Sequence, residues 1–215
     1  FDYVASDEPI TPDRLRAGHA LYIVSDFPVN GWAEGAMAAA VERARAGAGL
    51  LMIGGWESFH GAAGQYPHTP LAGALPVDIA NADDRVNCPQ PCWVEPAGEH
   101  PITAGLPWDR PPAIGGYNRF TPRPDAEVIL RARHAAVTAR VSGAAETPVP
   151  CCAYTFTPGG ADPLLVLGRC GGGRTAAMAT DVAPHWVGPL VDWGDARVHA
   201  QADGAEAVEV GTHYA

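Results

Sequence analysis

The hydrophobic pattern of the first quarter of the chain alternates between buried strands and a helix. Residues 19–27 contain a short run that is apolar on both faces, and residues 49–55 contain a second one, Leu-Leu-Met-Ile, that ends at two glycines. Residues 32–46 between them are rich in alanine and predict a helix that ends at Gly47. Strands that are apolar on both faces are typical of a parallel sheet covered by helices on each side. This pattern therefore predicts an α/β fold.

The rest of the chain gives weaker signals. Thr11-Pro12-Asp13 predicts a helix start, with a capping hydroxyl, proline at the first helical position and an acid near the positive end of the dipole. Residues 56–125 hold many prolines and glycines and few clear periods. The remaining predicted elements are a strand at 1–5, strands at 127–133 and 149–156, a hairpin of 163–169 with 174–181 around Gly171-Gly172-Gly173, and a weakly helical tail after Trp193.

Length and charge narrow the class of protein. The 215 residues predict a single domain over 1–215, and the net charge of -10 argues against nucleic acid or an anionic membrane as a partner. All 14 basic side chains are arginine, which excludes a Schiff-base lysine, a pyridoxal phosphate anchor and a lysine-containing P-loop. No cofactor is predicted. We expect a cytoplasmic protein, because neither a signal peptide nor an apolar run of the roughly 18 residues that a membrane span needs is visible.

The five cysteines do not predict a disulfide framework. Cys88 and Cys92 are separated by three residues, Cys151 and Cys152 are adjacent, and Cys170 stands alone. Neither pair has the two-residue spacing that marks most zinc sites built from four cysteines. The spacing therefore argues against such a site, and no metal is predicted.

Polar side chains follow three of the predicted strands. The segments are Ser25-Asp26, residues 54–61 and residues 180–186. If these strands are parallel neighbours, their ends meet at one edge of the sheet, here called the rim, where ligands bind in open parallel sheets. Six reactive side chains would then lie on the rim: Asp26, Glu57, Ser58, His60, Asp181 and His185.

Each of these residues also has a purely structural interpretation. Asp26 can cap the turn that follows it. Gly54 and Gly55 can simply end a strand, and His185 can be a packed histidine. The hypothesis of a site rests on their coming together at the rim.

The segment Leu51-Met52-Ile53-Gly54-Gly55-Trp56-Glu57-Ser58-Phe59 resembles the putative class I glutamine amidotransferase-like family, close to its trehalose-utilisation-type proteins. Further landmarks in the same order extend the resemblance over about residues 20–195: Ser25-Asp26, Thr69-Pro70, Asp84-Arg85, Glu99-His100-Pro101, Gly116-Tyr117-Asn118, Gly173-Arg174 and Pro184-His185-Trp186. The resemblance implies a flavodoxin-like three-layer sandwich with a mostly parallel central sheet. It also implies that the family's first strand and helix are missing here, so we expect another segment to cover the exposed strand edge.

The same resemblance implies a catalytic cysteine on the sharp turn after a buried strand. Here that turn reads Gly54-Gly55-Trp56-Glu57 and contains no cysteine. Ser58 is the nearest hydroxyl, but it lacks small flanking residues, and His185 stands near the family's catalytic histidine without an acid close behind it. Glutamine hydrolysis by the standard route is therefore not expected.

Four functions remain open. The first is binding of a small polar metabolite, a sugar or an amino-acid-like molecule, by Asp26, Gly55, Trp56, His60, Tyr117, Asn118 and Trp186. The second is a hydrolase or lyase with His185 as general base, Asp181 or Glu57 orienting it, and Ser58 as nucleophile. The third is a metal site at Asp26, His60, Asp181 and His185. The fourth is a subunit role in a homo-oligomer.

Overall fold

A six-stranded mixed sheet organises the protein. The computed structural model describes residues 2–142, 151–182, 184–201 and 206–214. The strands lie in the order β1 (Leu21–Ser25), β2 (Gly49–Ile53), β10 (Gly173–Met178), β9 (Cys151–Cys170), β8 (Glu127–Ser142) and β5 (Cys92–Pro96). The pairs β1–β2 and β2–β10 are parallel, whereas β10–β9, β9–β8 and β8–β5 are antiparallel.

The prediction of a mostly parallel sheet is therefore wrong, although β1, β2 and β10 are parallel neighbours. The cause lies in the connections. Residues 143–150 between β8 and β9, and residues 171–172 between β9 and β10, are too few for a parallel crossover, which takes about a dozen residues. The second half of the sheet is therefore built from hairpins.

The helices and the smaller strands surround this sheet. Their bounds are α1 (Pro12–Arg16), η1 (Val29–Gly31), α2 (Ala36–Arg45), α3 (Pro70–Ala74), β3 (Val77–Ile79), β4 (Arg85–Asn87), β6 (Gly116–Asn118), β7 (Phe120–Pro122), α4 (Pro184–Val187), η2 (Gly188–Asp192), β11 (Arg197–Ala200) and β12 (Val208–Gly211). The pairs β3–β7, β4–β6 and β11–β12 are antiparallel. No helix within the described ranges is long and apolar enough to cross a membrane.

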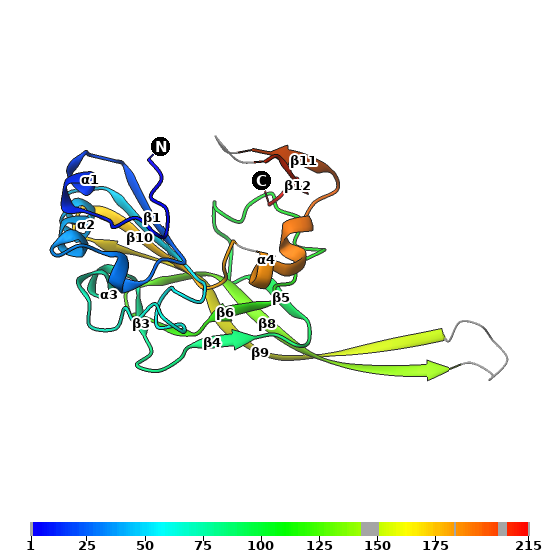
Figure 1. Cartoon of the computed structure of the whole chain (residues 1–215). Helices are drawn as coiled ribbons and strands as arrows, with labels where there is room; N and C mark the ends of the chain where they lie inside the picture. Colours follow the sequence, from blue (N-terminus) through cyan, green and yellow to red (C-terminus); the bar gives the residue numbers. More distant parts are fainter. Residues whose placement is uncertain (1, 143–150, 183, 202–205, 215) are drawn as a thin grey trace.

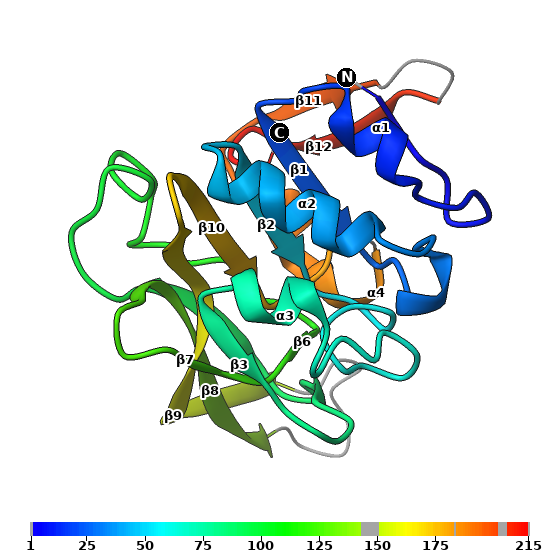
Figure 2. The same cartoon turned by 90° about the vertical axis from the view of Figure 1, so that its left-hand side faces the viewer.

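Helices lie on both sides of the part of the sheet that contains the parallel strands. Figure 1 shows α1, α2 and α3 on one side, with α4 and the β11–β12 pair on the other. In Figure 2 helix α2 crosses in front of β2. Its buried face is made of small side chains, Ala36, Ala39, Ala40, Val41 and Ala44, which allow the helix to approach the sheet closely.

Strand β1 differs from its prediction, because it lies at the edge of the sheet and only one of its faces is covered. Tyr22 and Val24 are buried, but Leu21 and Ile23 on the other face are 51% and 56% exposed. The expectation of helices over both faces is therefore wrong for this strand.

Both ends of the chain also depart from the predictions. Residues 2–5 form no strand, and Phe1 lies outside the described residues. The tail forms the β11–β12 pair instead of a helix, since valines alternate along it at 198, 208 and 210.

The hairpin predicted around Gly171 is confirmed as β9–β10, with Gly171 at a φ of 59°. The strand predicted at 149–156 is confirmed from residue 151 onward, and its first two residues lie outside the described part. Both long strands exceed their predicted lengths. As a result β8 and β9 project from the body as a two-stranded arm, which is visible in Figure 1.

Candidate functional site

The ends of β1, β2 and β10 converge at the rim. Gly54, directly after β2, donates its N–H to the carbonyl oxygens of Met178 at 2.7 Å and Thr180 at 3.2 Å. A β-carbon on Gly54 would stand 1.9 Å from the carbonyl oxygen of Ala179. Only glycine therefore allows the β2 turn to lie against the end of β10.

Asp26 holds the β2 turn from the side of β1. It adopts a left-handed conformation with a φ of 46°, and its N–H donates to Ser58 Oγ at 3.0 Å. Its Oδ1 accepts from the N–H of Glu57 at 2.6 Å. A β-carbon on Gly55, whose φ is 153°, would stand 2.3 Å from the same Oδ1. Asp26 thus ties the first strand end to the second.

Asn118, at the end of β6, holds the same turn through its side-chain amide. Its Oδ1 accepts from the N–H of Gly55 at 2.9 Å, and its Nδ2 donates to the Gly55 carbonyl at 3.1 Å and to Asp84 Oδ1 at 2.8 Å. Asp84 also accepts from the backbone N–H groups of His60 and Gly61, each at 2.9 Å. Both side chains are buried. Asn118 and Asp84 therefore position the whole 54–61 loop through its backbone.

Ser58, the predicted nucleophile, does not reach solvent. Ser58 is fully buried, and its Oγ is occupied by the Asp26 N–H. Glu57 is half-buried on the side of Tyr66, where its negative charge adds to the burial that raises the pKa of that phenol. Ser58 is thus packed as a structural hydroxyl, without the exposure that a nucleophile needs.

Trp56 presents the exposed apolar surface of the rim. Its side chain is 44% exposed. Arg85 lies over the indole with its guanidinium carbon 4.5 Å from the ring centroid, and the exposed His185 meets the ring edge-on at 5.7 Å. Arg85 also pairs with Asp83 at 2.7 Å. The indole is therefore held in place by one cation and one imidazole.

The carboxyl group of Asp181 is buried at the rim, and its pKa is raised. It is 4% exposed, and its Oδ1 has no hydrogen-bond partner among the described residues. Burial and then the negative charge of Asp26 raise the pKa of Asp181 to about 6, against smaller opposing effects of the Trp186 and Val187 N–H groups and of His185. A carboxyl group with this pKa can donate or accept a proton near neutral pH.

Two of the predicted ligand-binding aromatics are packed inside the protein. Tyr117 and Trp186 are fully buried. The Trp186 indole donates to Asn87 Oδ1 at 3.0 Å and packs on Gly116, where a β-carbon would stand 2.4 Å from its ring. Tyr117 points away from the rim toward His134. Neither ring offers a free face to a ligand, and periodicity gave no signal of their burial.

The metal hypothesis at the rim finds no support in the geometry. Within the described ranges, Asp26, His60, Asp181 and His185 do not supply three ligand atoms close enough together to hold an ion. The Nδ1 atom of His60 instead lies 3.2 Å from the carbonyl oxygen of its neighbour Gly61.

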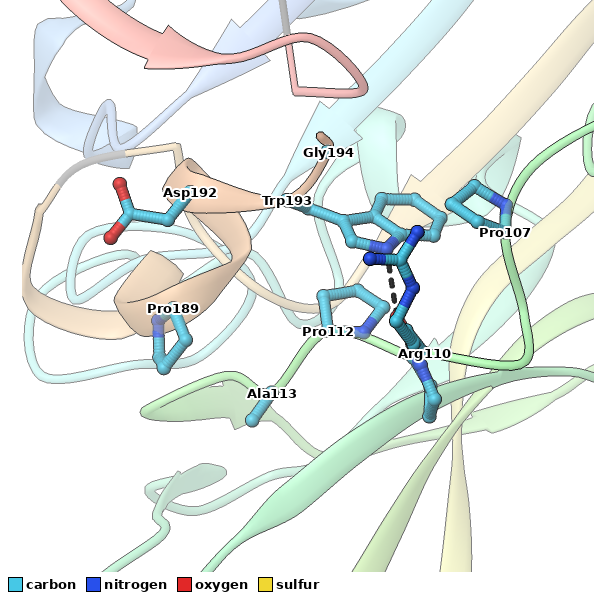
Figure 3. Close-up of a pocket in the computed structure, with 9 residues that line it drawn as sticks. Pro107, Arg110, Pro112, Ala113, Pro189, Asp192, Trp193 and Gly194 are labelled. Atoms are coloured by element: carbon cyan, nitrogen blue, oxygen red, sulfur yellow. Dashed lines mark hydrogen bonds between the residues drawn. The ribbon is translucent and has the colours of Figure 1, made fainter. Parts of the chain in front are cut away.

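Two surface pockets lie away from the rim. The first, drawn in Figure 3, has a volume of about 290 Å³ and is lined mainly by prolines together with Arg110, Asp192 and Trp193. The Trp193 indole donates to the Arg110 carbonyl at 3.0 Å and forms one wall. The second, of about 330 Å³, lies beside α3 and Arg123. Neither pocket contains a residue that was predicted as functional.

Comparison with known proteins places the chain in a family. Residues 36–200 match the model of the family described as putative glutamine amidotransferase, and the chain belongs to this family. Cytoplasmic protein STM1381 from Salmonella typhimurium LT2 is 29% identical, with a TM-score of 0.66 over 88% of this chain and 73% of that one. Cytoplasmic protein STM3548 from Salmonella typhimurium is 30% identical, with a TM-score of 0.66 over 86% and 70%. No curated protein matches.

Proposed function

We propose that this protein binds a small polar ligand, a sugar or an amino-acid-like molecule, at the rim beside Trp56, Asp181 and His185. The observation that carries the proposal is the buried Oδ1 of Asp181, which has no hydrogen-bond partner among the described residues. A buried polar atom without a partner costs about 1–3 kcal/mol. An O–H or N–H of a bound ligand would remove this cost.

The surroundings of Asp181 suit a ligand that has one apolar and one polar side. The exposed indole of Trp56 offers a flat surface for the C–H face of a sugar ring or for an aliphatic side chain. Arg85 and His185 add donors beside the indole. These contacts favour a ligand with hydroxyl or carboxylate groups.

The turn after β2 argues against glutamine hydrolysis, the activity that the family's description implies, in this chain. Cysteine is absent from residues 54–61, and neither Gly54 nor Gly55 has room for a side chain. Ser58 is buried with its oxygen engaged. Hydrolysis of glutamine through a thiolate on this turn therefore has no nucleophile.

The proposal also covers the type of fold and the cellular compartment of the protein. The parallel pairing of β1, β2 and β10, with α2 lying over β2, supports a flavodoxin-like sandwich in the parallel half of the sheet. The two Salmonella relatives are named cytoplasmic proteins, which supports the same compartment for this chain.

A thermal-shift screen of monosaccharides and amino acids tests the binding proposal. We expect at least one ligand to raise the melting temperature of the wild type, and its affinity to fall about tenfold or more in Trp56→Ala and in Asp181→Asn, which corresponds to about 1.4 kcal/mol. Asp125→Asn, an exposed acid outside the rim, is the matched control and should bind as the wild type does. The proposal fails if no ligand binds, or if the hits bind both rim variants unchanged.

General acid–base chemistry at the same place is the second candidate, as a hydrolase or lyase. It is favoured by the pKa of about 6 for Asp181 together with the nearby His185. Asp181 would donate a proton and His185 would accept one, with no part for Ser58. Turnover of a panel of activated esters and glycosides should then be lost in Asp181→Asn and His185→Ala. Turnover equal to background in the wild type would reject this candidate.

A further inference from the structure

A cluster of sulfur and nitrogen ligands lies in the antiparallel half of the protein, outside the rim. Cys88 follows β4 directly, Cys92 begins β5, and His134 lies opposite Cys92 in the β5–β8 register. Each residue contributes one ligand atom, and these atoms all lie within 4.8 Å of one another. Cys92 is buried, and the other two side chains are partly buried.

The loop between the two cysteines is fixed by the neighbouring strand. Residues 88–92 read Cys-Pro-Gln-Pro-Cys, and each proline holds φ near a single value. The Gln90 side-chain oxygen accepts from the N–H of Val137 at 3.0 Å, and the Pro91 carbonyl accepts from the N–H of Ala135 at 3.0 Å. Strand β8 thereby sets the position of both thiols before any ligand binds.

The histidine is oriented by a second layer of polar groups. The β8–β9 ladder shifts register next to His134, and such irregularities redirect a side chain. The Tyr117 hydroxyl lies 2.7 Å from His134 Nε2 and donates to Asp162 Oδ2 at 2.5 Å. That carboxylate oxygen stands 3.9 Å from the same ring nitrogen. Hydroxyl and carboxylate partners of this kind commonly fix histidines that bind metals.

The two thiols interact directly. A hydrogen bond from the Cys92 thiol lowers the pKa of Cys88, and the same hydrogen bond together with burial raises the pKa of Cys92. The two thiols therefore lie close enough together to serve as a pair of ligands.

We propose that Cys88, Cys92 and His134 form a zinc site, with a water molecule in the fourth position. Two thiolates and an imidazole are a ligand set that zinc prefers over magnesium or calcium. In a tetrahedral site the ligand atoms lie about 3.6–3.8 Å apart, so the cluster, whose ligand atoms lie within 4.8 Å of one another, has to contract by at most about 1 Å. Binding releases the remaining thiol protons to solvent.

Such an ion would join two segments that are far apart in the sequence. It would tie the β4–β5 connection to strand β8 at the base of the arm. This proposal is independent of the proposed ligand site at the rim, and either can fail without the other.

Titration of the reduced, metal-free full chain with Co²⁺ tests the site. We expect one equivalent to bind, with absorption bands typical of tetrahedral cobalt and of thiolate-to-cobalt charge transfer, and Zn²⁺ should displace it. Cys88→Ser and Cys92→Ser should each lower the affinity at least 100-fold, and His134→Gln should lower it at least tenfold. Cys170→Ser is the matched control, since Cys170 is another free cysteine outside the cluster, and it should bind as the wild type does.

The wild-type spectrum decides the question even if a variant fails to fold. Absence of binding, or binding without charge-transfer bands, overturns the proposal. An affinity unchanged in Cys88→Ser overturns it as well. Thiol counting in denaturant adds a further check, because the unmodified chain has five thiols. A count two lower before reduction, in the wild type but not in Cys92→Ser, would show a Cys88–Cys92 disulfide in place of the metal site.

Discussion

The parallel and antiparallel halves of the sheet use their polar side chains in different ways. At the ends of β1 and β2, Asp26, Asp84 and Asn118 bind backbone groups and hold the loops together. In the antiparallel half, His134 and Asp162 lie on strands and contact other side chains. Loops that converge need hydrogen bonds from side chains to keep their shape, whereas paired strands are already held by the backbone hydrogen bonds between them. Side chains on the strands are therefore available for ligands, and at the rim the exposed side chains of Trp56 and His185 are.

The largest change in the free energy of unfolding should come from removing a side chain that hydrogen-bonds to the loops of the parallel half. Asn118→Ala leaves the buried N–H and carbonyl of Gly55 without the partners that Asn118 supplies, and it removes one of the hydrogen bonds that Asp84 accepts. We expect the free energy of unfolding to fall by about 3–5 kcal/mol, measured by urea denaturation. Asn81→Ala, at an exposed asparagine, should change it by less than about 0.5 kcal/mol. Equal effects of the two variants would contradict the role given to Asn118.

A gain in stability is expected from removing the charge of Asp181, whose Oδ1 has no hydrogen-bond partner among the described residues. The pKa of Asp181 is raised from 3.8 to about 6 in the folded protein, so the folded state holds its proton more tightly than the unfolded state. The resulting loss in the free energy of unfolding is absent below about pH 4 and grows as the pH rises through 4–6. It reaches at most about 3 kcal/mol above that range.

Asp181→Asn removes this charge and should therefore stabilise the protein at about pH 7.5, with no gain at about pH 4. Chemical denaturation at the two pH values measures the difference. Asp125→Asn should show no such dependence on pH, since its carboxylate is exposed. A stabilisation of Asp181→Asn that is equal at both pH values would contradict the assignment.

The smallest effect is expected on the arm of the antiparallel half. Val137 and Ala139 of β8 stand opposite Phe156 and Tyr154 of β9, so the arm carries one mainly apolar face. Tyr154 is 60% exposed. Tyr154→Ser should lower the free energy of unfolding by less than about 0.5 kcal/mol. A loss several times larger, together with a lower mass by light scattering, would mean that a second copy covers this face.

The sequence predicted the parallel half better than the antiparallel half for a physical reason. The strands β1 and β2 are apolar runs that end in polar or glycine residues, and these signals are local. The convergence of Asp26, the 54–61 loop and Asp181 followed from that topology. The antiparallel half depends on pairings between distant segments, such as β5 with β8, which no local period encodes.

The candidate residues were predicted less well than the strands that carry them. Tyr117 lies within β6 and Trp186 within α4, and the packing of Trp186 on Gly116 buries its ring. Asp84 was missed as a site residue, because an acid outside the three strand ends has no pattern of its own. The cluster of Cys88, Cys92 and His134 escaped for the same reason, since its three-residue cysteine spacing is uncommon in zinc sites and its histidine lies on another strand.

The two glycines of the β2 turn also limit how this protein can change. Any side chain at Gly54 meets the backbone of Ala179, and any side chain at Gly55 meets Asp26. A cysteine at either position would therefore require a neighbouring segment to move as well. New chemistry on this scaffold is directed to side chains that already reach solvent, such as Trp56 and His185.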